Sequence, residues 1–166
     1  KGKYVAFVDS DDIWNNNKLI KQINFMERYK YLATHTSYDR VDINGKLIST
    51  RVAKNLDYKR LLNSCDIGLS SVILNKRILK KKIEFPPLKT KEDYVLWLKI
   101  AKTGVIFYGI KSRLMKWHNT PDSLSKSNFN KLTDAFKVYY NYEKAKLKEG
   151  PISILGPRLI NFNFIY

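Results

Sequence analysis

Cysteine, acidic residues and long apolar runs are all scarce in this chain of 166 residues. A single cysteine, Cys65, excludes an intrachain disulfide. No apolar run reaches the roughly 18 residues that a membrane-spanning helix needs. The sequence also lacks a glycine-rich phosphate loop, a cysteine cluster for zinc and a Gly-x-Ser-x-Gly turn. These absences argue against a P-loop enzyme, a zinc finger and an α/β-hydrolase.

The shortage of acidic residues gives the chain a strongly basic character. It has 31 Lys and Arg against 15 Asp and Glu, a net charge of +16. This excess favours anionic partners, namely nucleotides, nucleic acid or an anionic membrane surface, without choosing among them. Hydrophobic residues make up 44% of the chain, enough for one domain with a packed core. Against this background, clusters of acidic residues at 9–12 and 92–93 stand out.

The first acidic cluster directly follows an apolar stretch, 4–8, that has the character of a buried strand. It contains Asp9, Asp11 and Asp12 within four positions. Three close carboxylates repel one another unless a cation lies among them, and their oxygens suit Mg²⁺ or Mn²⁺. In open α/β sheets, ligands bind beyond the carboxyl ends of strands. The alternative is that Asp11 or Asp12 only caps a helix. We favour the metal site.

Hydrophobic periodicity and turn residues predict alternating strands and helices. In the helix that follows Asn15-Asn16-Asn17, we expect Leu19, Ile20, Ile23 and Met26 to face inward and Lys18, Lys21 and Glu27 outward. Asn44-Gly45 predicts a hairpin turn. We expect helices at 18–30, 57–63, 90–102 and 130–148, a basic helical turn at 77–82, and strands at 4–8, 31–37, 38–43, 46–48, 70–74, 105–110 and 114–117.

This alternation predicts an α/β fold with a mixed sheet flanked by helices. We expect one domain over 1–150, followed by an apolar tail over 151–166. The apolar strand at 4–8 is typical of the centre of a parallel sheet, covered on both faces. We therefore expect the chain to be part of a longer protein.

The second acidic cluster, Glu92-Asp93, opens the helix predicted at 90–102. Thr90-x-x-Asp93 fits a capping box, in which Asp93 would only satisfy helix-terminus donors. A carboxylate held at a helix start is also rigidly aimed, as a general base must be. If this end faces the metal site, Asp93 could take a proton from an incoming hydroxyl, and Glu92 could orient that hydroxyl.

Two histidines have different expected roles. His35 lies in a predicted strand, and we expect it to be structural. His118 follows a strand and precedes a polar loop, where it could contact a metal or phosphate. In that loop, Ser125 and Lys126 could bind diphosphate oxygens. A structural role for His118 is the alternative.

Together these segments resemble glycosyltransferase family 2, whose members have the GT-A fold. The stretch Phe7-Val8-Asp9-Ser10-Asp11-Asp12-Ile13-Trp14 resembles the DxD segment of the family. The stretch Ser70-Ser71-Val72-Ile73-Leu74 resembles its acceptor-side strand, and Lys91-Glu92-Asp93-Tyr94 with Trp97 resembles its ED motif. Trp117-His118-Asn119 with Ser123-Leu124-Ser125 resembles its loop after the sheet. Four motifs therefore occur in the family's order.

The resemblance implies a nucleotide-sugar donor, a Mn²⁺ or Mg²⁺ ion and an inverting single displacement. Asp9 would lie near the ribose or metal, and Asp11 would bind the metal on the sugar diphosphate, with Asp12 as a neighbour. Asp93 would be the catalytic base. Family members begin with strand–helix units that bind the nucleotide base, and these are missing here. We therefore expect the chain to match the C-terminal portion of the domain and to show little or no transfer activity alone.

The resemblance also suggests bacterial surface glycan synthesis, with a glycan or lipid-linked saccharide as acceptor. We expect a cytoplasmic location, and the basic charge leaves open a peripheral contact with the inner face of the cell membrane. The alternatives are a nucleic-acid-binding module or a membrane-peripheral interaction domain without catalysis. The scattered lysines and the acidic clusters argue against nucleic acid.

Overall fold

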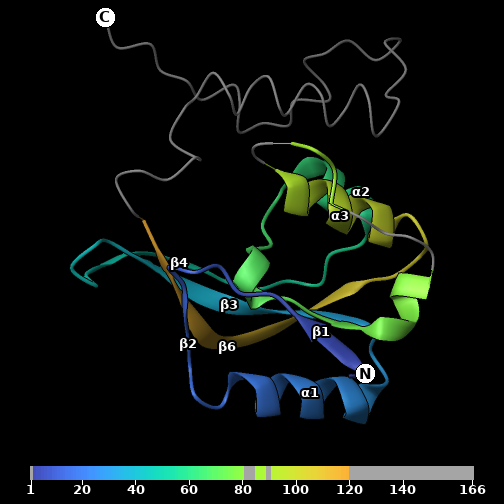
Figure 1. Ribbon diagram of the computed structural model, residues 1–166, viewed down its shortest axis with the longest axis horizontal. Helices are drawn as coiled ribbons and strands as arrows, with labels where there is room; N and C mark the ends of the chain where they lie inside the picture. Colours follow the sequence, from blue (N-terminus) through green and yellow to red (C-terminus); the bar gives the residue numbers. More distant parts are fainter. Residues whose placement is uncertain (1, 81–84, 89–90, 120–166) are drawn as a thin grey trace, which may run out of the picture.

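A computed structural model describes residues 2–80, 85–88 and 91–119 (Figure 1). The helix predicted at 130–148, the apolar tail at 151–166, and Ser125 and Lys126 lie outside these described residues. No helix within the described ranges is long and apolar enough to cross a bilayer.

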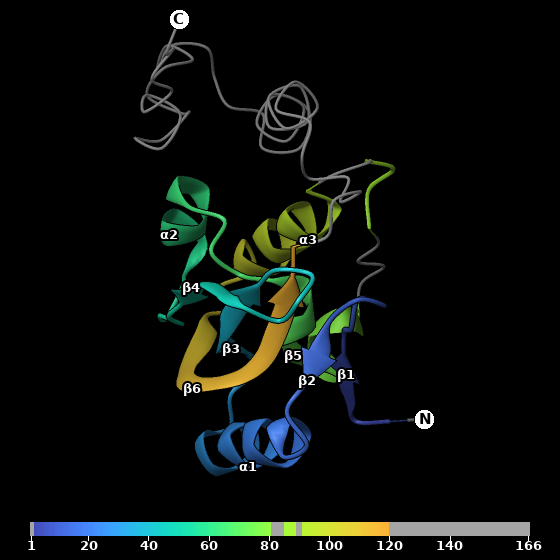
Figure 2. The ribbon, with the colours of Figure 1, turned by 90° about the vertical axis from the view of Figure 1, so that its left-hand side faces the viewer.

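The fold is α/β, with one six-stranded mixed sheet as predicted. Among the strands that the structure describes, β3 and β6 run parallel and every other pair is antiparallel. Helix α1 covers one face of the sheet, and α2 and α3 lie on the other (Figures 1 and 2). The sheet order is β1 (Tyr4–Ala6), β5 (Ile73–Asn75), β3 (Ala33–Val41), β6 (Phe107–His118) and β2 (Ile13–Trp14), and β4 (Leu47–Arg51) pairs with β3.

Two pairs of predicted strands are each a single strand in the structure. The stretches 31–37 and 38–43 form one strand, β3, and the two strands predicted within 105–117 form one strand, β6. Between Thr36 and Ser37 the register against β6 jumps from Ile110 to Arg113. The extra residues make a bulge that bends β6 (Figure 2). This exposed polar bulge is why the sequence pattern looked like two strands.

The strand predicted at 4–8 is shorter than expected, since β1 ends at Ala6. Within the described residues, β1 lies at the end of the sheet, pairs antiparallel with β5 and is half-buried or exposed along its length. The strand predicted at 70–74 begins instead as a 3-10 turn, Leu69–Ser71, and becomes β5 only at Ile73. The basic turn predicted at 77–82 is a 3-10 helix, Lys76–Lys80.

The hairpin around Asn44-Gly45 is confirmed between β3 and β4. Its loop is longer than a two-residue turn. Asp42 organises it, because its Oδ1 accepts hydrogen bonds from the backbone N–H groups of Asn44 and Lys46. Gly45 has a φ of 78°, a conformation that glycine adopts without strain.

Helix α1 (Lys18–Tyr29) is confirmed, but its inner face was predicted wrongly. Lys18, Gln22 and Met26, spaced four apart, are the buried residues, whereas Leu19 and Ile20 are exposed. Lys18 is fully buried because its charge has partners inside the protein. Its Nζ donates to Gln22 Oε1 (3.0 Å) and lies 4.2 Å from the centre of the Trp14 ring.

The apolar core lies on the opposite face of the sheet, around α3 (Glu92–Ala101) and α2 (Tyr58–Asn63). Trp97 of α3 is fully buried and meets Phe7 and Phe107 edge-on, with ring centroids 5.5 Å apart in both pairs. Phe7 therefore links the segment that leads into the first acidic cluster to the helix that begins with the second. His35 is buried in β3 with Nε2 2.8 Å from the Lys54 carbonyl oxygen, as expected of a structural histidine.

The burial of Lys18 predicts a specific pH dependence of stability. Burial lowers the pKa of Lys18 from 10.5 to about 8. Between these values the unfolded chain binds more protons than the native protein, so the free energy of unfolding rises with pH. We expect urea denaturation of the full-length protein to show a gain of about 2 kcal/mol between about pH 7.5 and about pH 10, relative to Lys18→Met.

Lys21→Met is the matched control, because Lys21 is an exposed lysine of the same helix. It should keep the pH-dependent gain. The same pH dependence in Lys18→Met and the wild type would show that Lys18 is not buried as a cation.

Candidate functional site

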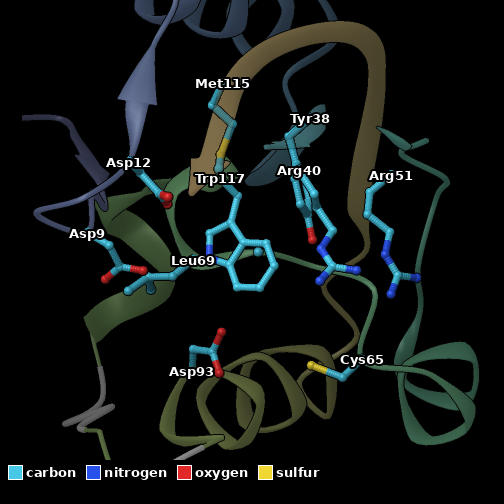
Figure 3. Close-up of a pocket in the computed structure, with 11 residues that line it drawn as sticks. Asp9, Asp12, Tyr38, Arg40, Arg51, Cys65, Leu69, Asp93, Met115 and Trp117 are labelled. Carbon is cyan, nitrogen blue, oxygen red and sulfur yellow. The ribbon is translucent and has the colours of Figure 1, made fainter. Parts of the chain in front are cut away.

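A cleft of about 440 Å³ brings both acidic clusters together (Figure 3). Asp9 and Asp12 line it from the loop after β1, and Asp93 lines it from the first turn of α3. Side chains of Tyr38, Arg40 and Arg51 lie toward the other end, and Leu69, Met115 and Trp117 lie between them. Carboxylates more than 80 residues apart in the sequence thus share one cavity, as the sequence predicted.

The turn at Ser70 holds the acidic loop in place. Ser70 Oγ accepts a hydrogen bond from the Asp9 backbone N–H (2.9 Å), and the Ser70 carbonyl accepts one from Trp14 Nε1 (2.8 Å). The loop is thereby fastened at both ends to one buried turn. Helix α1 fixes this turn from the other face of the sheet, because Gln22 Nε2 donates a hydrogen bond to the Ser71 carbonyl (3.0 Å).

Helix α3 aims Asp93 at the cleft. The N-cap of the helix is Lys91, in a left-handed conformation and without a side-chain capping bond. Thr90, the cap in the capping-box alternative, lies outside the described residues. Asp93 Oδ1 accepts a hydrogen bond from the Tyr94 backbone N–H (2.7 Å). This contact fixes the carboxylate in the first helical turn.

The carboxylates of the cleft perturb one another. Burial first, and then the negative charges of Glu92 and Asp9, raise the pKa of Asp93 to about 6. Burial likewise raises the pKa of Asp12 to about 6, with smaller contributions from Asp9 and Asp11. The pKa of Asp9 is raised first by burial and then by Asp11 and Glu92. The negative charge of each acidic segment therefore raises the pKa of a carboxyl group in the other.

Three further predicted site residues, Asp11, Glu92 and His118, do not line this cleft. Asp11 is exposed at the loop. His118 ends β6, and its Nδ1 is buried without a partner among the described residues. Glu92 is half-buried and its Oε2 also lacks a partner there.

Sequence reasoning missed the basic end of the cleft. Tyr38 and Arg40 are two residues apart on β3, and Arg51 of β4 lies opposite Tyr38. The sequence did contain a signal for this. Residues i and i+2 of a strand lie on one face, so Tyr38 and Arg40 share a face, and Arg51 follows the hairpin on the paired strand. Their position opposite the acidic clusters depends on tertiary structure and could not be read from the pattern.

The acidic end fits part of a divalent metal site. Among the residues the structure describes, no three His, Cys, Asp or Glu side chains gather closely enough to hold a metal by themselves. Mg²⁺ in proteins commonly uses one or two carboxylates and takes its other ligands from water and substrate phosphates. Asp9 and Asp12 supply two carboxylates, and Asp12 Oδ1 is buried without a partner in the described part of the chain. This donor set suits an ion shared with a phosphate-bearing ligand.

The fold identifies the class of protein. A crystal structure of Staphylococcus aureus TarS, residues 1–349, superposes with a TM-score of 0.59 at 19% identity, covering 93% of this chain and 45% of that one. The same protein in complex with UDP-GlcNAc superposes with a TM-score of 0.58 over 76% of this chain and 38% of that one. The chain therefore has a GT-A glycosyltransferase fold.

Sequence comparison gives the family. The profile of Glycosyl transferase family 2 matches residues 1–84, and the chain belongs to this family. Two Escherichia coli relatives, WfaP and WfgD, are each described as a UDP-Glc:α-D-GlcNAc-diphosphoundecaprenol β-1,3-glucosyltransferase. WfaP is 39% identical over 63% of this chain and 41% of its own length. WfgD is 33% identical over 82% of this chain and 54% of its own length. The chain thus spans about half the length of these relatives.

The Ser70 contact can be tested by a pair of serine variants. Ser70→Ala removes the acceptor for the Asp9 N–H and the hydroxyl that lowers the pKa of Asp12. We expect a loss of about 1 kcal/mol in stability. We also expect shifted amide resonances for Asp9 and Asp12, and a higher pKa for Asp12 in an NMR titration.

Ser71→Ala is the control, because Ser71 Oγ donates to the Gly68 carbonyl (2.6 Å) and does not contact the acidic loop. It should lose similar stability and leave the titration of Asp12 unchanged. The same change in both variants would contradict the specific role of Ser70.

Proposed function

We propose that the protein containing this chain is a bacterial glycosyltransferase that moves a sugar from a nucleotide-sugar donor to a hydroxyl of a lipid-linked saccharide. The proposal is supported most directly by the shared cleft, in which Asp9 and Asp12 lie with Asp93. Family membership supports the reaction class. The functions of the relatives WfaP and WfgD support a nucleotide-sugar donor, a diphospholipid-linked acceptor and a place in bacterial surface glycan synthesis.

In this proposal Asp93 is the general base. Its carboxylate takes the proton of the acceptor hydroxyl, and the hydroxyl oxygen forms a bond to the anomeric carbon of the donor. The bond from that carbon to the diphosphate oxygen breaks, and the nucleoside diphosphate leaves with this electron pair. A single displacement of this kind inverts the anomeric centre. A pKa of about 6 leaves Asp93 ionised at neutral pH and still basic enough to accept a proton.

Glu92 supports this base. Its negative charge contributes to the raised pKa of Asp93. Its Oε2 is buried and has no hydrogen-bond partner among the described residues, so it is available to a substrate hydroxyl. We therefore assign Glu92 the role of orienting the acceptor beside Asp93.

Asp9 and Asp12 would hold a Mn²⁺ or Mg²⁺ ion at the acidic end of the cleft. Asp11 and His118 are further candidate ligands, because Asp11 adjoins Asp12 and His118 Nδ1 is buried without a partner among the described residues. A bound ion would neutralise charge on the departing diphosphate. Ser125 and Lys126 remain proposed contacts of that diphosphate. Burial is the main cause of the raised pKa values of Asp9 and Asp12, and the negative charges of neighbouring carboxylates add to it.

Replacing the base should separate catalysis from binding. In the full-length protein, Asp93→Asn keeps the size and position of the side chain but cannot accept the proton. We expect transfer to fall by at least about 10²–10⁴-fold. Donor affinity, measured by calorimetry with Mn²⁺, should stay within about twofold.

Two variants frame this result. Asp57→Asn alters an exposed carboxylate that caps α2, and asparagine caps equally well, so activity should be unchanged. Asp12→Asn should weaken donor binding that depends on Mn²⁺. Loss of donor binding in Asp93→Asn, or full activity in it, would refute the base assignment.

The pH profile gives an independent test of Asp93. Because the base must be ionised, kcat/KM should rise with pH and level off above about pH 6. Glu92 raises the pKa of Asp93, so Glu92→Gln should move the midpoint of the acidic limb to lower pH. A midpoint that does not move in Glu92→Gln would show that the limb reports another group.

A further inference from the structure

Three adjacent strands present one polar face to the cleft, opposite the carboxylates. Arg40 of β3 pairs with Trp117 of β6, and Tyr38 of β3 pairs with Arg51 of β4. Tyr38 and Arg40 are two residues apart and so lie on the same face of β3. All four side chains line the cleft, and Figure 3 shows both guanidinium groups at the end away from Asp9.

Arg40 is held in place without being neutralised. Its guanidinium carbon lies 4.7 Å from the centre of the Trp117 ring, an arrangement that fixes the plane of the group. Its Nε is buried and has no hydrogen-bond partner among the described residues, and Arg40 forms no ion pair with any of them. A buried donor on a permanent cation is costly unless a ligand supplies the acceptor.

The neighbouring groups supply further hydrogen-bond donors, although Arg51 is itself ion-paired with Asp66. Arg51 donates one hydrogen bond to Asp66 Oδ1 (3.2 Å), and its side chain is 37% exposed, so donors remain available. Burial raises the pKa of Tyr38 to about 12, so its hydroxyl stays protonated at neutral pH and can donate. By contrast, Asp39 lies on the other face of β3 and contacts Arg113 (3.4 Å) and Thr50 (2.7 Å).

We propose that Arg40, Arg51 and Tyr38 bind a phosphate or diphosphate group of the acceptor. The inference rests on the proposed function, and it specifies that the acceptor carries this anion next to the sugar whose hydroxyl reacts at Asp93. Arginine suits the site because its planar, multiply donating group matches phosphate oxygens. The Trp117 ring, between the two ends of the cleft, offers an apolar surface to that sugar.

The position of the charges assigns this anion to the acceptor rather than the donor. The donor diphosphate belongs with a cation at Asp9 and Asp12, at the acidic end. The acceptor hydroxyl must reach Asp93, and an anion on the same molecule is repelled by the carboxylates and attracted to the arginines. One cleft can therefore keep two diphosphates apart by charge.

A binding experiment tests the site without requiring catalysis. A short-chain alkyl diphosphate is titrated into the full-length protein in EDTA, where a cation-dependent diphosphate site is not available. Wild type should bind it, and Arg40→Gln should weaken binding about ten- to a hundredfold. Arg40→Lys keeps the positive charge but loses the planar guanidinium group, so its affinity should lie between those of wild type and Arg40→Gln. Arg113→Gln is the charge-matched control on the opposite face of the sheet and should bind as wild type.

A kinetic experiment then identifies which substrate carries the anion. Two acceptors with the same saccharide are compared, one as its diphosphate and one with an uncharged alkyl group. Arg40→Gln should raise KM about ten- to a hundredfold for the diphosphate acceptor and leave KM for the donor and for the uncharged acceptor within about twofold.

Each other outcome has a definite meaning. Equal binding by wild type and Arg40→Gln, or no binding by wild type, overturns the proposed site. A raised donor KM in Arg40→Gln also overturns it, because the arginine would then serve the donor. Binding of the alkyl diphosphate that depends on Arg40, together with no transfer to either acceptor by wild type, would keep the anion site and refute the proposed function.

Discussion

The edge-on contact between Phe7 and Trp97 is the constraint on which the cleft depends. Phe7 lies two residues before Asp9, and Trp97 lies four residues, about one helical turn, after Asp93. Packing these rings 5.5 Å apart brings the acidic loop and the start of α3 to the same cavity. Trp97 is fully buried and also meets Phe107 of β6, so the contact is fixed to the centre of the sheet. The core thus sets the separation between the proposed metal end and the proposed base.

A second, polar layer on the other face of the sheet orients the loop itself. Lys18 of α1 donates to Gln22, and Gln22 donates to the Ser71 carbonyl. The same turn receives hydrogen bonds from Trp14 and from the backbone of Asp9. Such a network stabilises only when its members are all satisfied, and it then holds one geometry. Precise placement of the carboxylates is what a site for diphosphate and a shared cation requires. The resulting cleft is polarised, with carboxylates at one end and guanidinium groups at the other.

Much of this could be predicted from the sequence, and the errors share a physical cause. Local patterns predicted the mixed α/β sheet, α1, α2, α3 and the hairpin. The density of carboxylates predicted that the two acidic clusters would share one cleft, and Asp9, Asp12 and Asp93 line it whereas Asp11 does not. The buried face of α1 was predicted wrongly, because a lysine with internal partners looks like a surface residue in a periodicity argument. The bulge in β6 was missed, since exposed residues inside a strand resemble a turn. Arg40 and Arg51 were missed because their common face appears only once β3, β4 and β6 are assembled.

The most direct test of this account is a crystal structure of the full-length protein with Mn²⁺ and a non-hydrolysable nucleotide-sugar. Anomalous scattering from manganese locates the ion independently of the surrounding coordinates. The account predicts manganese at Asp9 and Asp12, with the anomeric carbon of the sugar facing Asp93 across the cleft. Manganese bound elsewhere, or an anomeric carbon turned away from Asp93, would contradict it.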